Sequence, residues 1–159
     1  MSYCLSLAYA ICQCITINSK NISFITQLLV HTAYRRRGIA TEMLRSLFRL
    51  SKNLSWGIVS ASPFAILALE KATHRKANPN CMRKHYDEIK KFSQKILYCK
   101  DKKIHIDKKS SYINTEYHIN HEKIPEEIQW RLGDLPDGHE WLAITFADQP
   151  RDTGNSWFL

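Results

Sequence analysis

Two apolar stretches near the start of the chain are separated by a short polar cluster. Residues 5–17 and 23–30 are rich in apolar and β-branched side chains, and the turn formers Asn18-Ser19-Lys20-Asn21 lie between them. Strands joined by so short a turn pair with each other in antiparallel fashion. The pattern therefore predicts a β-hairpin.

Beyond the hairpin, the spacing of apolar residues changes to that of one helical face. This spacing predicts a helix from Ile39 to about Lys52. The apolar run 56–60 predicts a buried strand, parallel to the previous one because a helix joins the two. Ser62 as N-cap and Pro63 at the first helical position then predict a second, largely buried helix. The hairpin thus leads into a βαβ unit.

The second half of the chain is more polar, and its patterns are shorter. Apolar residues at helical spacing predict one amphipathic helix over 80–97. Further elements are expected as strands at 103–106, 112–119 and 141–146, and as a short helix from Pro125 that Gly133 closes. Together these patterns predict an α/β fold, an α+β arrangement around a mixed sheet.

The size and composition of the chain are those of one ordinary globular domain. Its 159 residues are 44% hydrophobic and 24% charged. We expect a single domain over 1–159, with a core at 1–75, a basic extension that includes the final strand at 76–148, and a tail at 149–159.

The cysteines and the first apolar segment indicate where the protein resides. The five cysteines are scattered and lack the paired spacing of a zinc site, so we expect reduced thiols in a cytoplasmic protein. The segment 3–17 lacks a basic start and is too short to cross a bilayer. We therefore expect no membrane association.

The net charge of +8 is concentrated in one part of the chain. Between Glu70 and Lys109 there are thirteen Lys and Arg and five Asp and Glu, which gives 13 − 5 = +8 and leaves the rest neutral. A solvated helix face with lysine-rich loops accounts for this charge. The same charge also permits the protein to bind nucleic acid or an acidic protein, either as a binding module or as an enzyme that docks its substrate there. A homodimer is equally permitted.

A basic, glycine-containing loop lies between the second predicted strand and the first predicted helix. Its sequence is Tyr34-Arg35-Arg36-Arg37-Gly38-Ile39-Ala40. Unpaired N–H groups at the helix N-terminus converge there with cationic side chains, and this combination binds phosphate. Glycine allows positive φ or close approach of a ligand to the backbone. The turn is therefore a candidate phosphate site.

The six residues from Arg35 to Ala40 resemble the acetyl-coenzyme A signature of the GNAT superfamily of N-acetyltransferases, Q/R-x-x-G-x-G/A at a strand-to-helix turn. Leu28, Val30 and Tyr34 fit apolar or aromatic positions before it, and a helix, a strand and a second helix follow in the family's order. The resemblance covers about residues 5–73. It implies a GNAT-like fold in which two parallel strands splay apart.

This resemblance also implies a cofactor and its contacts. Acetyl-coenzyme A would be the acyl donor, and an amine would attack its thioester directly, without an acyl-enzyme. Backbone groups of Leu29 and Val30 would bind the pantetheine arm in the gap between strands, and the amides of 36–41 would hold the pyrophosphate. The predicted cofactor-binding residues are Leu29, Val30, Arg35, Arg36, Arg37, Gly38, Ile39, Ala40, Thr41 and Ser62.

The catalytic groups depart from the family pattern. Leu69 stands where many family members have a tyrosine that protonates the leaving thiolate, and Ser62 replaces the usual asparagine. Tyr34, Tyr98 and Tyr117 are alternative proton donors, and the sequence does not choose among them. No general base is predicted, because Glu42 and His31 have plainer explanations as surface and loop residues.

The elements before the motif strand also differ from the family. Its members usually carry a strand, two helices and another strand before the hairpin, and those helices help to shape the acceptor site. Three alternatives follow: residues 76–148 build the acceptor site, a partner supplies the missing wall, or the domain binds the cofactor without efficient catalysis.

Several histidines lie in the second half of the chain, but their spacing matches no compact metal-binding motif. We therefore expect no metal site.

Overall fold

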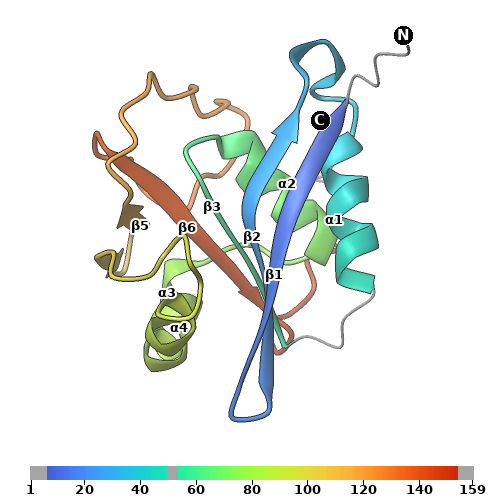
Figure 1. Cartoon of the computed structure of the whole chain (residues 1–159). Helices are drawn as coiled ribbons and strands as arrows, with labels where there is room; N and C mark the ends of the chain where they lie inside the picture. Colours follow the sequence, from blue (N-terminus) through green and yellow to red (C-terminus); the bar gives the residue numbers. More distant parts are fainter. Residues whose placement is uncertain (1–6, 50–53, 154–159) are drawn as a thin grey trace, which may run out of the picture.

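The computed structural model describes residues 7–49 and 54–153, and its strands form one six-stranded sheet in the order β1-β2-β3-β6-β5-β4 (Figure 1). The strands are β1 Ala8–Ile17, β2 Lys20–Val30, β3 Ser55–Ser60, β4 Ile104–Ile106, β5 Ser111–Asn114 and β6 His139–Phe146. The helices are η1 Thr32–Tyr34, α1 Ile39–Arg49, α2 Pro63–Thr73, α3 Pro79–Lys84 and α4 Tyr86–Ser93. Of these strand pairs only β2 and β3 run parallel, so the sheet is mixed, as expected.

The predicted hairpin and βαβ unit are confirmed. Strands β1 and β2 pair antiparallel, and β3 pairs parallel to β2 after the crossover through α1. The hairpin turn is tighter than expected, because only Asn18 and Ser19 form it, with φ of 49° and 62°. Two positive φ values in a two-residue loop are typical of a type I′ turn, whose twist matches that of the strands. Lys20 and Asn21 consequently belong to β2. The predicted end of the first helix at Lys52 lies outside the described residues.

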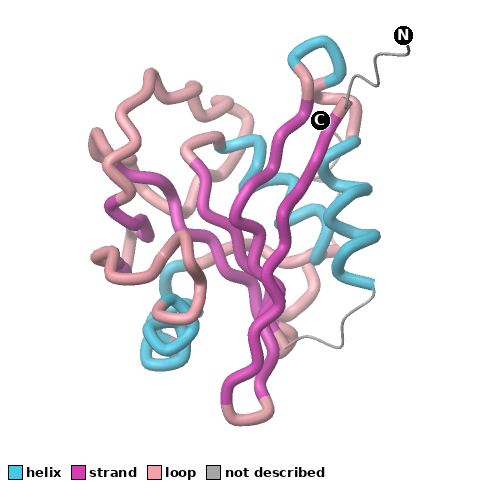
Figure 2. The backbone as a smooth tube through the Cα atoms, viewed as in Figure 1, coloured by secondary structure: helices cyan, strands magenta, loops and turns pink. Residues whose placement is uncertain are grey.

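Strands β2 and β3 separate halfway along their length. Their pairing runs from Ile22–Ser55 to Ile25–Ile58 and stops there, whereas β2 continues beside β1 to Val30. The separation coincides with a β-bulge, because Ile11 pairs with Gln27 while Cys12 pairs with Ile25, which leaves Thr26 as the extra residue. A bulge bends a strand and increases its local twist. Figure 2 shows the two strands diverging toward their carboxyl ends.

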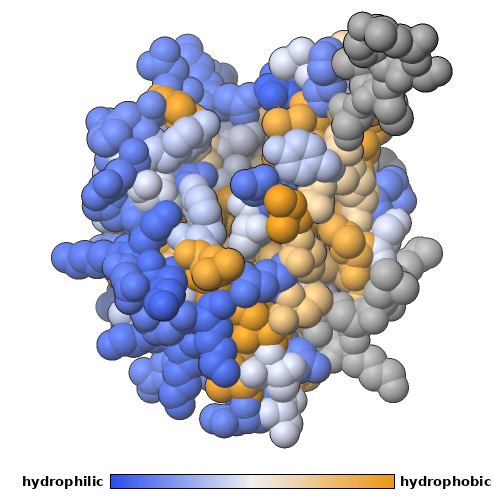
Figure 3. Space-filling model, in the orientation of Figure 1, coloured by the Kyte–Doolittle hydropathy of each residue, from blue (hydrophilic) through white to orange (hydrophobic). Residues whose placement is uncertain are grey.

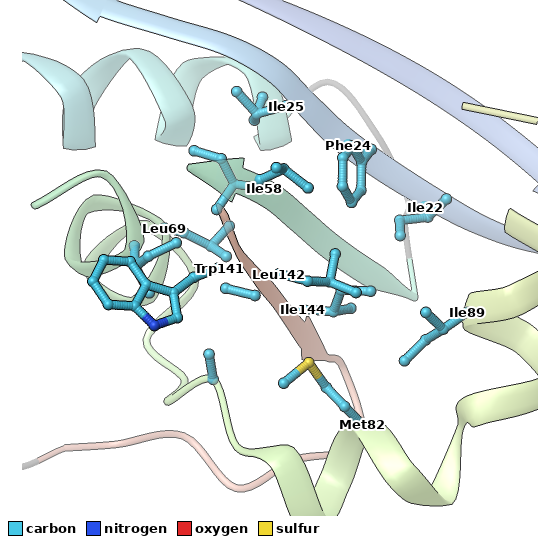
Figure 4. Packing of buried hydrophobic residues seen from close by; sticks show 14 of the residues in the cluster. Ile22, Phe24, Ile25, Ile58, Leu69, Met82, Ile89, Trp141, Leu142 and Ile144 are labelled. Atoms are coloured by element: carbon cyan, nitrogen blue, oxygen red, sulfur yellow. The ribbon is translucent and has the colours of Figure 1, made fainter. Parts of the chain in front are cut away.

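Helices cover the two faces of the sheet in separate pairs. The Thr145 hydroxyl donates to that of Thr73 on α2, whereas Phe146 stacks on His85 between α3 and α4. Because neighbouring strand residues point to opposite faces, α2 lies on one face and α3 and α4 lie on the other. Helix α1 packs against α2. Figure 4 shows the same division, with Leu69 beside Trp141 on one side of β6 and Met82 on the other.

Several predictions for the second half were wrong. The helix expected over 80–97 is broken at His85, whose φ of −106° and ψ of 20° end α3 before α4 begins. The strand expected over 112–119 ends at Asn114. No helix begins at Pro125, because residues 126 and 127 form only a turn, and so Gly133 closes none. These segments pack through tertiary contacts that their periodicity did not reveal. The final strand was correctly predicted and begins two residues earlier than expected.

No helix in the described ranges is long and apolar enough to cross a membrane.

Gly57 on β3 has no space for a side chain and allows a stability test. A Cβ atom at this residue would lie 2.6 Å from Cδ2 of Phe24 and 3.3 Å from Cγ1 of Ile144. We predict that Gly57→Ala lowers the free energy of unfolding by about 1–3 kcal/mol, because the core has no room for the methyl group. Urea denaturation measures this loss.

The double variant Gly57→Ala/Phe24→Leu provides the control. Its loss of stability should be smaller than the sum of the two single losses, since leucine removes the ring that clashes. Additive losses, or an unchanged midpoint for Gly57→Ala, would contradict this account of the packing.

Candidate functional site

A cleft of about 1800 Å³ lies where β2 and β3 separate. One wall is formed by the end of β2, the turn after it and the start of α1, and another by the end of β3 and by α2. Residues of the segment 117–129 line it as well. Nine of the ten predicted cofactor-binding residues line this cleft: Leu29, Val30, Arg35, Arg36, Gly38, Ile39, Ala40, Thr41 and Ser62. The tenth, Arg37, lines a separate hollow.

The turn between η1 and α1 presents a row of free backbone N–H groups. Within the described part of the chain, no hydrogen bond is recorded from the N–H groups of residues 36–41, and the first helical bond runs from Glu42 N to Gly38 O. Arg36 and Gly38 have positive φ of 60° and 78°. Alternating right- and left-handed residues curve the backbone so that successive N–H groups converge on an anion. The turn therefore has the geometry of an anion-binding nest at a helix N-terminus.

Two features of this turn indicate adaptation to a ligand. Arg36 adopts a positive φ without being glycine, a strain that is concentrated at functional positions. A Cβ atom built on Gly38 would meet nothing within 4 Å, so the glycine is required for its backbone conformation and not for packing. The space beside Gly38 is open to a ligand.

The three arginine side chains of the turn have different surroundings. Arg35 donates from Nε to the carbonyl oxygen of Val30 at 3.0 Å and so ties the turn to the end of β2. The Arg36 guanidinium lies over the Phe64 ring on α2, 4.8 Å from its centroid. The Arg37 guanidinium lies over Tyr34, 5.4 Å from its centroid, outside the cleft. Arg35 and Arg36 therefore bring positive charge to the cleft, and Arg37 does not line it.

The backbone groups that face the gap follow from the pairing of β1 and β2. His31 N donates to Leu7 O at 2.9 Å across this pair. Because antiparallel neighbours alternate between hydrogen-bonded and non-bonded positions, Leu29 directs its N–H and C=O toward β1, and Leu28 and Val30 direct theirs toward the gap. Beyond Ile25, β3 does not pair with β2. The backbone groups of Val30 thus face the gap, as predicted. Those of Leu28 also face it, whereas those of Leu29, which were expected there, point toward β1.

A carboxylate from the segment 117–129 lies between two of the predicted cofactor-binding residues. Glu122 accepts a hydrogen bond from the Ser62 hydroxyl through Oε2, and its Oε1 lies 3.7 Å from Arg35 Nη1. Ser62 is the N-cap residue of α2, as predicted, but its side chain makes no capping hydrogen bond. In this structure the side chains of Arg35 and Ser62 both contact Glu122.

A second carboxylate, Glu140 on β6, also lines the cleft. It is 7% exposed and accepts a hydrogen bond from the Tyr98 hydroxyl at 2.5 Å. Burial, together with this bond, raises the pKa of Tyr98, so its phenol stays protonated and donates. Sequence reasoning missed both Glu122 and Glu140, because no local motif marks them and only the tertiary fold brings them to the cleft.

The other catalytic candidates are placed as follows. Leu69 is fully buried in the core and does not line the cleft. Tyr34, Tyr98 and Tyr117 all line it. His31 accepts from Ala33 N through Nδ1 and so caps η1. Of the alternative proton donors, only Tyr98 is hydrogen-bonded to a buried carboxylate.

Two histidines of the second half lie beside single carboxylates, His105 beside Asp107 and His118 beside Asp137. In the part of the chain that the structure describes, no group of three or more His, Cys, Asp or Glu residues could hold an ion.

Comparison with known proteins supports the class that this geometry indicates. Residues 8–73, which run from β1 to the end of α2, match the family described as "Acetyltransferase (GNAT) family". This match supports a place in the GNAT superfamily of acetyltransferases for the segment that forms the turn and the separating strands. Searches of curated proteins and of solved structures returned no match.

The position of Glu122 generates a test of the anion site. We predict that Glu122→Gln binds coenzyme A about two- to fivefold more tightly than the wild type, because an exposed ion pair of this kind contributes little and competes with the ligand's phosphates. Isothermal titration calorimetry at low salt measures the affinity.

Glu126→Gln is the matched control. It removes an exposed carboxylate of the same segment that also lines the cleft, without touching Arg35 or Ser62. Equal effects of the two variants, or weaker binding by Glu122→Gln, would show that Glu122 does not compete with phosphate.

Proposed function

We propose that the protein transfers an acetyl group from acetyl-coenzyme A to an amine by direct attack of the amine on the thioester. The observation that carries this proposal is the junction of two features in one cleft: the anion-binding turn at the start of α1 and the unpaired stretch of β2 beside it. The match of residues 8–73 to a family of acetyltransferases supports it.

Each feature of the cleft complements one part of the cofactor. The free N–H groups of residues 36–41 and the side chains of Arg35 and Arg36 match a pyrophosphate. The pantetheine arm contains amide groups, which can pair with the backbone of Leu28 and with the N–H of Val30 as an added strand would, while the carbonyl oxygen of Val30 accepts from Arg35. Because β2 and β3 do not pair beyond Ile25–Ile58, this arm can bind beside β2 without breaking an existing strand pair.

The proposed chemistry depends on positioning and on polarisation of the thioester. A backbone N–H that faces the gap can donate to the thioester carbonyl oxygen, where negative charge develops during attack. Holding the amine beside that carbonyl replaces an encounter in solution by a reaction within one complex. Since Leu69 is buried in the core, the leaving thiolate takes its proton from another group.

Gly38 provides the test of cofactor binding. We predict that Gly38→Glu abolishes stabilisation by acetyl-coenzyme A in a thermal shift assay, because glutamate is strained at a φ of 78° and places negative charge where phosphates must approach. The control, Gln94→Glu, adds the same charge at an exposed residue that does not line the cleft, and it should respond to the ligand like the wild type.

Turnover is measured separately, as release of free thiol from acetyl-coenzyme A over a panel of primary amines. Amine-dependent release that is lost in Gly38→Glu is the expected result. Cofactor binding without release for any amine would favour a binding module instead. Undiminished binding by Gly38→Glu would refute the role of the turn.

A further inference from the structure

Glu140 lies on the face of the sheet opposite to the cofactor turn. Leu142 and Phe146 share the strand β6 with it, and Phe146 points toward α3 and α4. Every second residue of a strand points to the same face, so Glu140 also points away from α1 and α2. The last pair between β3 and β6 is Ser60–Trp141, which places Glu140 just beyond the carboxyl end of β3.

The environment of Glu140 leaves its charge without a cationic partner. Glu140 is 7% exposed, and among the described residues no Lys, Arg or His nitrogen lies within 4 Å of its carboxylate. The nearby ammonium group of Lys102 lies over the ring of Tyr98, 4.1 Å from its centroid. The bond from Tyr98 is made to Oε2. Buried carboxylates in proteins are nearly always paired with a cation or a ligand.

The cleft connects Glu140 with the cofactor turn through the gap in the sheet. Both the turn residues and the Tyr98–Glu140 pair line it, although they approach from opposite faces. On the side of Glu140, α4 lies near the turn end of the hairpin, where Lys20 pairs with Glu88, and apolar side chains gather over β1 and β2 in Figure 3. Tyr9 and Leu29 belong to this surface, are 42% and 43% exposed, and line the cleft. One anionic group thus lies in a cleft with aromatic and apolar walls.

We propose that Glu140 binds the protonated amine of the acceptor, which enters from this open face while acetyl-coenzyme A enters from the face of α1 and α2. The inference rests on the proposed function and names the class of its second substrate, a primary amine on an apolar or aromatic body. Tyr98 is a positioning residue that holds the carboxylate toward the cleft.

The proton balance of the reaction follows from this arrangement. The ammonium group gives one proton to Glu140, and the neutral amine then attacks the thioester carbon. A C–N bond forms and the C–S bond breaks. The second proton of the amine passes to the departing thiolate, and Glu140 returns its proton to water. The products are the acetamide, coenzyme A as a thiol and one released proton.

The test compares amines with neutral analogues on the protein saturated with coenzyme A, which cannot acetylate them. The probes are phenethylamine against 2-phenylethanol and hexylamine against hexanol, with affinities from calorimetry. We expect the wild type to prefer each amine about tenfold or more, as a charge-assisted hydrogen bond in a buried site provides. In Glu140→Gln this preference should largely disappear. In Glu126→Gln, which lacks an exposed carboxylate of the same cleft, it should persist.

A kinetic measurement separates binding from a structural role. With phenethylamine as acceptor and acetyl-coenzyme A as donor, kcat/KM of Glu140→Gln should fall about tenfold or more. The acid limb of its pH profile should move to higher pH, because the variant depends on amine that is already neutral in solution. Tyr98→Phe should raise the KM for the amine while the pH profile keeps its shape.

The possible failures are distinguishable. Absence of coenzyme A binding by the wild type would refute the proposed function, and this inference with it. Normal coenzyme A binding with no preference for amines, or a preference that survives in Glu140→Gln, would overturn the inference alone. Loss of coenzyme A binding in Glu140→Gln would likewise overturn it, because Glu140 would then support the fold of the cleft and not the acceptor.

Discussion

The separation of β2 from β3 is the constraint on which the site depends. A strand that loses its neighbour exposes backbone N–H and C=O groups, and such groups need partners. The bulge at Thr26 keeps β2 paired with β1 while directing it away from β3. The cleft is therefore a result of hydrogen-bonding geometry within the sheet, and a ligand with amide groups is the natural partner for the exposed edge.

Positive and negative groups lie in different parts of this cleft. At the turn, free N–H groups lie beside arginine side chains, and Glu122 contacts Arg35 and Ser62. At the end of β3, on the other face of the sheet, Glu140 is a buried anion without a cationic partner among the described residues. This distribution is the basis of the proposed arrangement, in which an anionic donor binds from one side and a cationic acceptor from the other.

Local patterns predicted those parts of the fold that local physics determines. The hairpin, the crossover through α1 and the glycine-containing turn before α1 follow from turn formers, helical period and a glycine that needs positive φ, and all are found close to their expected positions. The break at His85 and the absence of a helix at Pro125 depend on packing between distant segments. For the same reason Glu140 could not be found from sequence, since an acidic residue at the start of a strand carries no local signal. The backbone groups of Leu28, and not those of Leu29, point toward the gap, because their direction depends on the register of β1 and β2.

Mapping the binding of coenzyme A by amide chemical shifts would test the central claim most directly. In nitrogen-15-labelled protein, the largest shifts on titration with coenzyme A should fall on the amides of residues 36–41 and on those of Leu28 and Val30, with smaller changes at Leu29. Pantetheine, which carries no phosphate, should perturb the amides of the strand but leave those of the turn nearly unchanged. Shifts concentrated outside the cleft, or turn amides that do not respond to coenzyme A, would contradict the account.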